Sequence, residues 1–331
     1  MRIGLAYDLK DDIEAGRDIP EDALEEYDSI KVVRAIAHSL RALGHSTVKL
    51  GGGRKFLLNI LKTRVDFVFN IAEGRGSLRS REAQVPAILE MMNIPYSGSD
   101  PLTLALTLDK PLAKHIVRSA GVATPPWVTV DSMGDIRSLG AKDIPLPAFI
   151  KPAFEGSSKG IRLTSRVDTA SRARAAAKAL MERYGQPVII EKYIEGEEIT
   201  VGITGNSPPS IVGIMRVVPT KKFKTFVYSL EVKRDWRKLV DYECPAGLKR
   251  STMKRIGESS IKAYQALGCR DFARVDYRVA PDGTPYFLEV NPLPGLNPDS
   301  GDLPIMSYKM GWTYQQLIGR VLKSALARYL L

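Results

Sequence analysis

Short apolar segments alternate with amphipathic helical segments through the first hundred residues, and this alternation restricts the fold more than any other feature. Residues 2–7, 46–50 and 65–70 have the length and apolar content of buried strands. Residues 30–43 and 56–62, which lie between them, are predicted helices. A β-α-β-α-β order places parallel strands side by side, so this part of the chain predicts an α/β domain with helices covering a parallel sheet.

The rest of the chain mixes helices with further strands. Residues 270–279 and 285–290 form a predicted hairpin, because Asp282-Gly283 between them is a strong turn signal. Further strands are predicted at 127–130, 148–151, 161–164, 188–191, 200–204 and 211–218, and further helices at 82–92, 109–120, 170–183, 248–267 and 313–329. A length of 331 residues by itself suggests roughly two domains.

Composition excludes several classes of protein. Hydrophobic residues make up 44% and charged residues 26% of the chain, which argues against long disorder. Two cysteines, Cys244 and Cys269, are too few for a disulfide scaffold and lack the paired spacing of a structural zinc site. The sequence has no apolar run of about 18 residues that would span a membrane and no signal-peptide pattern after Met1. We therefore expect a cytoplasmic protein with no membrane partner.

A net charge of +11 leaves three kinds of anionic partner open: nucleic acid, an anionic surface, or small substrates such as nucleotides. The positive excess is concentrated between Arg216 and Arg255. This basic segment includes Lys221, Lys222, Lys224, Lys233, Arg234, Arg237 and Lys238, with Phe223, Phe226, Tyr228 and Trp236 among them. Interleaved basic and aromatic residues keep a nucleic-acid-binding protein as the alternative from another class.

A glycine- and serine-rich loop follows the predicted strand at 148–151. Gly156, Ser157, Ser158 and Gly160 would let backbone N–H groups approach phosphate oxygens closely, and Lys151 at the strand end supplies a point charge. This loop predicts a phosphate site, although a flexible hairpin is the alternative on the loop alone.

Acidic residues alternate with apolar ones on the two strands of the predicted hairpin. Arg274 and Asp276 share a face of the first strand, and Glu289 and Asn291 share a face of the second. Hard oxygen ligands on a rigid sheet suit Mg²⁺, which prefers one or two carboxylates together with substrate phosphates. The hairpin therefore predicts a magnesium site, with a charged solvent-facing surface as the alternative.

A third polar cluster lies at the end of the predicted strand at 188–191. Glu191 and Lys192 end this strand, and Ile194 and Glu198 follow. A strand end with a lysine, a backbone acceptor and a later carboxylate can recognise an adenine edge and a ribose diol. A salt-bridged strand end is the alternative when this cluster is considered alone.

Taken together, these motifs resemble the ATP-grasp superfamily, and specifically the D-alanine–D-alanine ligases. The resemblance is carried in order by 94–99 with 108–110, 151–160, 190–198, 231–233, 269–276 and 288–295. It implies α/β and α+β architecture: an N-terminal Rossmann-like α/β domain (1–100), a central lid (101–190) and a C-terminal α+β domain (191–331). It also implies an enzyme, an ATP-dependent ligase that forms an amide or peptide bond between two amino acids through an acyl phosphate and releases ADP and phosphate.

The resemblance also implies a role for each matching residue. Phosphates would be held by Lys110, Lys151 and Lys233 with Gly156 and Ser158, adenine by Glu191, Lys192, Ile194 and Leu288, and ribose by Glu198. Mg²⁺, or Mn²⁺ in its place, would be bound by Asp276, Glu289 and Asn291. Arg274 and the Gly295 N–H would stabilise the oxyanion, Ser157 would position substrate, and Ser300 would meet the second substrate's carboxylate.

The departures from the family pattern fall on the substrate side. The family's glutamate after its first strand has no counterpart in 6–10, its histidine in a later loop corresponds to Glu73, and its tyrosine after the lysine of 231–233 corresponds to Arg234. We expect retained chemistry with an altered amino-acid pocket, in which Glu73 and Arg234, with Arg79 and Arg81, recognise a charged or larger substrate. Surface charge in mobile loops, a different dipeptide or amide product, an ATP-binding regulator without turnover, and a homodimer all stay open.

Overall fold

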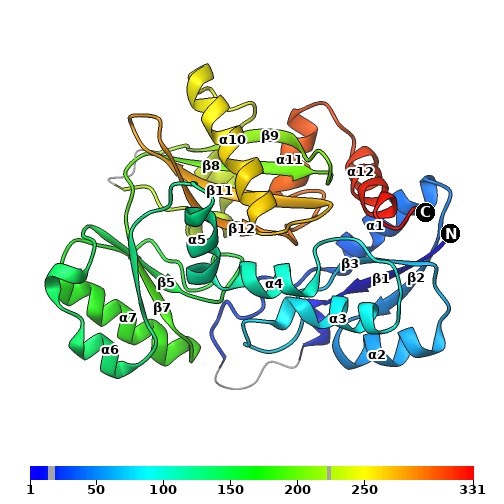
Figure 1. Ribbon diagram of the computed structural model, residues 1–331, viewed down its shortest axis with the longest axis horizontal. Helices are drawn as coiled ribbons and strands as arrows, with labels where there is room; N and C mark the ends of the chain where they lie inside the picture. The colour runs from blue at the N-terminus through cyan, green and yellow to red at the C-terminus, as the bar shows by residue number, and fades with distance from the viewer. Residues whose placement is uncertain (14–18, 222–224) are drawn as a thin grey trace.

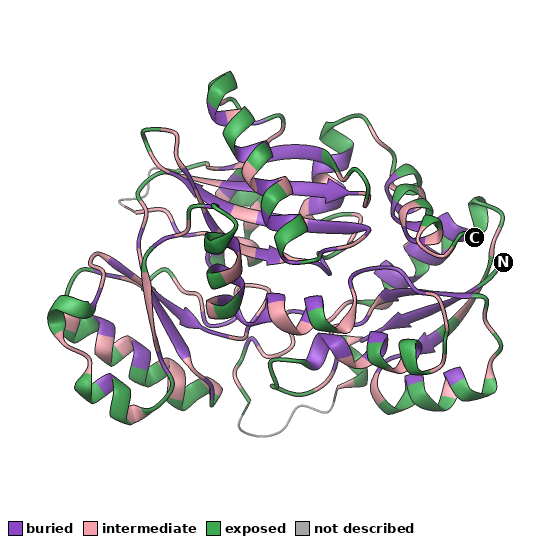
Figure 2. Ribbon diagram, viewed as in Figure 1, coloured by how far each residue is buried: buried purple, intermediate pink, exposed green. Residues whose placement is uncertain are grey.

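The computed structural model describes residues 1–13, 19–221 and 225–331, and it contains three sheets that lie side by side (Figure 1). The strands of all three sheets are largely buried, and the helices around them expose one face (Figure 2). Lys222, Phe223 and Lys224 of the basic segment lie outside the described residues. None of the described helices is long and apolar enough to cross a membrane.

The first sheet is the predicted parallel α/β unit. Its order is β2 (Ser46–Gly51), β1 (Arg2–Tyr7), β3 (Phe67–Ile71), and both pairings are parallel. Side chains alternate across β1, so Ile3, Leu5 and Tyr7 pack with helix α1 on one face, while Ala6 packs toward α2 and α3 on the other. The helices are α1 (Ile30–Ala42), α2 (Gly53–Lys62) and α3 (Gln84–Met91).

The second sheet is antiparallel, with the order β4-β7-β5-β6. Its strands are β4 (Trp127–Val130), β5 (Ala148–Pro152), β6 (Arg166–Val167) and β7 (Val188–Lys192), and the helices α6 (Met133–Ser138) and α7 (Ala170–Tyr184) pack with them. The strand predicted at 161–164 is wrong. The Arg162 amide donates to the Ser165 hydroxyl, and the Ser165 amide donates back to the Arg162 carbonyl, so this apolar segment is a turn and pairing starts only at β6.

The third sheet is antiparallel, with the order β10-β9-β8-β11-β12. Its strands are β8 (Glu197–Thr204), β9 (Ser210–Pro219), β10 (Val240–Glu243), β11 (Phe272–Val279) and β12 (Pro285–Asn291). Helices α10 (Arg250–Ala266) and α5 (Lys110–Ser119) pack on one face, and α11 (Asp302–Lys309) packs against β9. In the predicted hairpin, the register sets Asp276 opposite Glu289 and Arg274 opposite Asn291.

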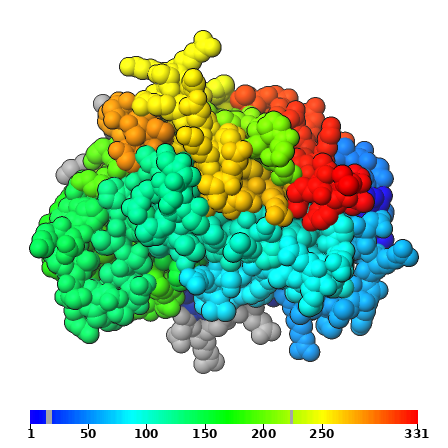
Figure 3. All heavy atoms as spheres, in the orientation of Figure 1, coloured from blue at the N-terminus to red at the C-terminus, as the bar shows by residue number. Residues whose placement is uncertain are grey.

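Connections between the sheets fix the position of the site. Helix α12 (Tyr314–Ala327) returns from the third sheet to pack on α1. Helices α4 (Pro101–Leu108) and α5 both contact β12. In the space-filling view, the segment that contains them lies at the surface beside α10 (Figure 3). The first and third sheets each fall within one predicted range, whereas β7 of the second sheet runs past 190 to Lys192. The division of the chain into three domains stays a prediction. The remaining helices are η1 (Lys10–Asp12), η2 (Arg81–Ala83), η3 (Ala141–Asp143), α8 (Leu230–Arg234) and α9 (Trp236–Leu239).

Candidate active site

Two adjoining cavities contain the side chains that the sequence singled out. The smaller cavity, of about 100 Å³, lies between the second and third sheets, and the larger, of about 410 Å³, opens toward the first domain. Both are lined by Tyr228, Lys233, Arg274, Glu289 and Asp302, so they form one continuous cleft. Every residue predicted to bind ATP, metal or substrate lines one cavity or the other, except Arg79 and Arg81. The structure thus brings the rest of the predicted set together, and the role of each residue stays a prediction.

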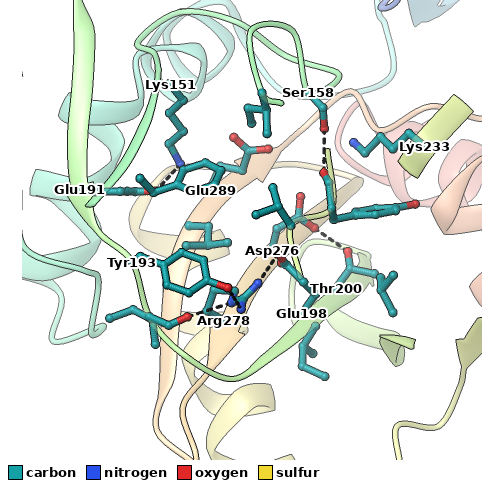
Figure 4. A pocket seen from close by; sticks show the side chains of 18 of the residues that line it. Lys151, Ser158, Glu191, Tyr193, Glu198, Thr200, Lys233, Asp276, Arg278 and Glu289 are labelled. Atoms are coloured by element: carbon teal, nitrogen blue, oxygen red, sulfur yellow. Dashed lines mark hydrogen bonds and ion pairs between the residues drawn. The ribbon is translucent and has the colours of Figure 1, made fainter. Parts of the chain in front are cut away.

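A buried carboxylate between two ammonium groups forms one wall of the smaller cavity. Glu191 Oε1 lies 2.7 Å from Lys151 Nζ, and Glu191 Oε2 lies 2.8 Å from Lys114 Nζ (Figure 4 shows the first pair). Burial opposes ionisation of Glu191, but the two lysines outweigh it and lower the pKa of its carboxyl. Burial lowers the pKa of Lys114 to about 8, although Glu191 opposes this. The pairing holds Lys151 in place beside the cavity.

Lys114 was not predicted from the sequence. It lies one helical turn after Lys110 on α5, and this i, i+4 spacing puts both ammonium groups on the same face of the helix. That spacing is the signal that could have found it. The Lys114 side chain is fully buried and also donates to the Thr124 hydroxyl at 2.8 Å.

The opposite wall of the smaller cavity holds a buried guanidinium. Arg278 Nη1 donates to Glu198 Oε1 at 2.6 Å, and Nη2 donates to the Tyr193 hydroxyl at 2.7 Å (Figure 4). Arg278 Nε also donates to the Ile194 carbonyl at 3.1 Å. Arg278, which the sequence reading missed, follows Asp276 by two residues on β11 and therefore shares its face. It fixes both the backbone at Ile194 and the carboxylate of Glu198.

The hairpin presents its polar face to the cleft. Asp276 accepts hydrogen bonds from the Arg274 guanidinium at 2.8 Å, the Thr200 hydroxyl at 2.6 Å and the Asn291 amide at 3.1 Å. Burial opposes the charge of Arg274, but Asp276 and Asp302 outweigh it and raise the pKa of the guanidinium. Arg274 Nη1 lies 3.0 Å from Asp302.

Positive charges surround Glu289 at the junction of the two cavities. Lys110 Nζ lies 3.3 Å from Glu289 Oε2 and also donates to the Glu155 carbonyl. Burial opposes ionisation of Glu289, but Lys110, Lys151 and further cations lower the pKa of its carboxyl to about 2. Glu289 is therefore ionised at every physiological pH.

Lys233 is a half-buried cation on the other side of this junction. Desolvation and the neighbouring charge of Arg274 lower the pKa of its ammonium group. It lies 5.2 Å from the centre of the Tyr228 ring, and among the described residues no carboxylate is within ion-pair distance of it. A partly desolvated ammonium group without an acidic partner is suited to an anionic ligand.

The donor set on the hairpin fits a hard divalent cation. Asp276, Glu289 and Asn291 offer carboxylate and amide oxygens from one face of adjacent strands, and Glu289 is fully ionised. Within the described ranges, no group of three or more His, Cys, Asp or Glu side chains could hold a metal ion. Because the set has only two carboxylates, substrate oxygens would complete the coordination of any ion bound here.

The glycine-rich loop has a backbone geometry that suits close approach of a ligand to its N–H groups. Ser157 and Ser158 have φ of 50° and 59°, and Gly160 has φ of 73°. Left-handed conformations at two consecutive serines are strained, and such strain persists only where the surroundings impose it. The end of the loop is held by the first sheet's side of the protein, because the Asp22 carboxylate accepts from the Gly160 amide at 2.9 Å.

A buried cluster of four charges joins this loop to the first domain. Arg81 Nη2 lies 2.9 Å from Glu26 and 3.3 Å from Glu155, while Lys159 lies 2.9 Å from Glu26 and 2.5 Å from Glu155. The two cations and two anions balance, and all four side chains are buried. Arg81 is therefore bound within the protein and lines neither cavity, and Arg79 pairs instead with Asp109 at 2.9 Å.

Three other carboxylates line the larger cavity and have no cation paired with them among the described residues. Asp28, Glu73 and Glu82 make no side-chain hydrogen bond or ion pair with any described residue. Burial raises the pKa of Glu82 to about 7 and, with the charge of Asp8, that of Asp28 to about 7. Burial and the charges of Glu82 and Glu26 raise the pKa of Glu73. Arg234, which also lines this cavity, is paired with Glu25 at 2.8 Å.

These raised pKa values predict that the protein loses stability as the pH rises. Folded Glu82 keeps a proton up to a pKa of about 7, whereas the unfolded chain releases it near 4.5. The stabilisation that Glu82 gains by keeping its proton in the folded protein is therefore complete below pH 4.5, the pKa in the unfolded chain. It is lost as the pH rises through about 7, the pKa in the folded protein. Relative to wild type, Glu82→Gln should raise the free energy of unfolding by about 1–3 kcal/mol at pH 8 and by little at pH 5. Urea unfolding at both pH values measures this, and equal stability of the two proteins at pH 8 would contradict it.

Several charges of the basic segment have partners within the protein, although Arg234 and Arg237 are exposed. Arg216 pairs with Glu197 at 3.1 Å and with Glu243 at 2.5 Å, Lys233 lines the cleft, and Arg234 is bound to Glu25. Arg237 lies 4.6 Å from the centre of the Trp236 ring. These contacts account for much of the described part of the segment without nucleic acid.

The chain resembles known proteins over nearly its whole length. Residues 116–323 match the family model described as the D-ala D-ala ligase C-terminus. The chain is 33% identical over 295 residues to the D-alanine–D-alanine ligase of Aquifex aeolicus (89% of this chain, 94% of the relative) and 32% identical over 303 residues to that of a Synechococcus strain (89% and 87%). A crystal structure of D-alanine–D-alanine ligase from Bacillus anthracis complexed with ATP superposes with a TM-score of 0.76 at 26% identity (99% and 98% of the two chains).

The three sheets and the cleft between the second and third define an ATP-grasp fold. Within that class the chain belongs to the D-alanine–D-alanine ligase family. The predicted fold, family and ligase class are therefore confirmed, and the ligase is preferred over the nucleic-acid-binding alternative.

Proposed function

We propose that this protein is an ATP-dependent ligase that joins the carboxylate of one amino acid to the amine of another through an acyl phosphate. The observation that carries the proposal is the ring of buried and half-buried cations, Lys110, Lys151, Lys233 and Arg274, around Glu289 where the two cavities meet. Such a ring suits a polyphosphate next to an acyl group. Membership of the D-alanine–D-alanine ligase family supports it.

The smaller cavity suits the nucleotide. Phe149, Ile199 and Leu288 supply apolar surface for a base, and the strand end at Lys192 and Ile194 lies beside them. Glu198, held by Arg278, is placed to accept hydrogen bonds from ribose hydroxyls. A relative of this family has been crystallised with ATP, which supports the assignment.

The reaction makes and breaks two bonds in turn. A carboxylate oxygen of the first amino acid attacks the γ-phosphorus, and the bond to ADP breaks as the lysines neutralise the leaving charge. The amine of the second amino acid then attacks the acyl carbon, phosphate leaves and the amine loses a proton. Arg274 and the Gly295 N–H line the larger cavity where the oxyanion develops. When bound by Asp276, Glu289 and Asn291, Mg²⁺ or Mn²⁺ would supply further neutralisation of phosphate charge.

The larger cavity suits the two amino acids, since Ser157 and Ser300 line it with the oxyanion donors. D-alanyl-D-alanine is one candidate product, and a different dipeptide or amide is the other, because Glu73 and Arg234 stand where the family pattern has histidine and tyrosine. A cytoplasmic location and a homodimer stay predictions.

The direct test is ATP-dependent ADP release with Mg²⁺ across a panel of D- and L-amino acids, singly and in pairs, with product masses read by mass spectrometry. We expect ADP, phosphate and a condensed product whose mass is that of two amino acids less one water. If no amino acid or pair raises ADP release above the amino-acid-free rate, the proposal is wrong.

A further inference from the structure

One end of the larger cavity is lined by three carboxylates that come from three separate parts of the first domain. Asp28 precedes α1, Glu73 follows β3, and Glu82 lies in η2. Other carboxylates that line this cavity have cationic partners, since Glu25, Glu26, Glu155, Glu289 and Asp302 are each paired with a lysine or arginine. The three carboxylates differ because no described lysine or arginine is within ion-pair distance of them, although the charge of nearby Arg81 still lowers the pKa of Glu73 and Glu82 against burial.

Glu82 is the clearest of the three. It is only 8% exposed, it lines the cavity, and it makes no hydrogen bond or ion pair with any residue in the described ranges. A buried carboxyl group without a partner is costly, so it indicates a binding partner that the protein alone does not supply. The raised pKa of Glu82, caused by burial, reflects the same cost.

A single metal ion does not fit these carboxylates. Across the described part of the chain, no three acidic, histidine or cysteine side chains are close enough to bind one ion. The negative charges influence one another nevertheless, because Glu82 and Asp28 both raise the pKa of Glu73. A partner that reaches all three must therefore carry positive charge spread over several ångströms, as an organic cation does.

The cluster lies next to the phosphate side of the cleft. Lys110, which is paired with Glu289, also acts on Glu82 and lowers its pKa against the effect of burial. An amino acid whose positive groups rest on the cluster can therefore direct its carboxylate toward Lys110 and the polyphosphate. This is the position of the amino acid that is activated.

The number of carboxylates without a cationic partner at this end of the cavity indicates how many positive charges that amino acid carries. Burial favours the protonated forms of the three carboxyl groups, and a bound cation would favour their ionised forms instead. Fully ionised, they would carry three negative charges, of which the extra cation at Glu25, shared by Lys10 and Arg234, offsets at most one. An α-ammonium group supplies one positive charge. A second, on the side chain, is needed for balance.

We propose that the amino acid activated by this enzyme carries a second positive charge, an amino or guanidino group on its side chain, and that Asp28, Glu73 and Glu82 hold its two cations. This inference rests on the proposed ligase function and specifies its first substrate. Ornithine, lysine and arginine, as D- and L-forms, are the probes, and norvaline and norleucine are uncharged partners of similar length.

The test measures ADP release and product mass for each probe, with the full-length protein, ATP and Mg²⁺. We expect kcat/KM for the preferred cationic amino acid to exceed that of its uncharged partner at least about tenfold. Glu82→Gln should remove most of this preference, because it should raise KM for the cationic substrate far more than KM for the uncharged partner, whose single cation the other two carboxylates still hold. The matched control is Glu258→Gln at an exposed residue of α10 that is paired with Lys254 on the same helix, and this variant should keep the preference.

The outcomes separate this inference from the proposed function. If D-alanine or another uncharged amino acid is used as well as the cationic ones, and Glu82→Gln changes neither rate, the inference is wrong while the ligase function stands. If no amino acid supports ADP release, the ligase function fails first. Should Glu82→Gln fail to fold, Glu73→Gln and Asp28→Asn test the same preference, because both carboxylates line the same end of the cavity.

Discussion

Replacing Glu289 with glutamine is expected to lower the rate of ADP release at least about a thousandfold. The substitution keeps the size of the side chain and removes its charge. The cleft stabilises the ionised form of Glu289, because burial is outweighed by Lys110, Lys151 and further cations that lower its pKa to about 2. Without it, those cations face one another unbalanced and the predicted divalent ion loses one of two charged ligands.

Steady-state ADP release at saturating ATP and Mg²⁺ measures this effect, with circular dichroism and thermal unfolding to show that the variant is folded. Glu258→Gln, the same substitution on the exposed face of α10, is the matched control and should retain full activity. If the Glu289 variant keeps its rate within about threefold of wild type, a difference of less than about 1 kcal/mol, the ligand assignment is wrong.

The sequence predicted features that depend on local spacing. Alternation along β11 and β12 predicts that Arg274 and Asp276 share one face and that Glu289 and Asn291 share another, and the turn at Asp282-Gly283 starts their pairing. The parallel first sheet follows in the same way from the β-α-β-α-β order. These features were predictable because each depends on residues within one hairpin or one repeating unit. The one-residue shift at Leu288, which brings Asp276 opposite Glu289 instead of Leu288, was not predicted.

Features that depend on distant contacts were not predictable. The acidic segment before α1 showed no function in the sequence, yet Asp22 and Glu26 reach the glycine-rich loop more than 130 residues later in the chain, through Gly160 and Lys159. The role of Arg81 is hidden for the same reason. The sequence predicts that it binds substrate from a loop, but its partners Glu26 and Glu155 are 55 and 74 residues from it along the chain. Only the packed structure shows that this charge is already neutralised.

The placement of charge follows one rule across the cleft. Groups that connect domains are balanced inside the protein, as in the cluster of Glu26, Arg81, Glu155 and Lys159. Groups that face the cavities are left unbalanced, with excess positive charge near Lys233 and excess negative charge near Glu82. Binding of an anionic nucleotide at one end and a cationic amino acid at the other would balance both, so stability and ligand affinity are linked at both ends.

The second large effect is expected for Arg81→Met, which should lower the free energy of unfolding by about 3–5 kcal/mol. The substitution leaves two buried carboxylates, Glu26 and Glu155, with Lys159 as their one remaining cation in the cluster, and it removes the hydrogen bond from Arg81 Nη1 to the Phe154 carbonyl at 2.9 Å. Breaking a buried ion pair by removing one partner is costly because the other charge stays buried. Urea unfolding of wild type and variant at one pH measures the difference.

Two further variants show whether the loss comes from charge balance. Arg79→Met removes a neighbouring arginine whose side chain is 64% exposed, so its pair with Asp109 should contribute only about 0–1 kcal/mol. The double variant Arg81→Met/Glu26→Met removes one charge of each sign and leaves Lys159 paired with Glu155, so it should recover much of the lost stability. A double variant that is no more stable than Arg81→Met would mean that Arg81 stabilises the protein by packing and its backbone contact, and the charge-balance account of the cluster would then be wrong.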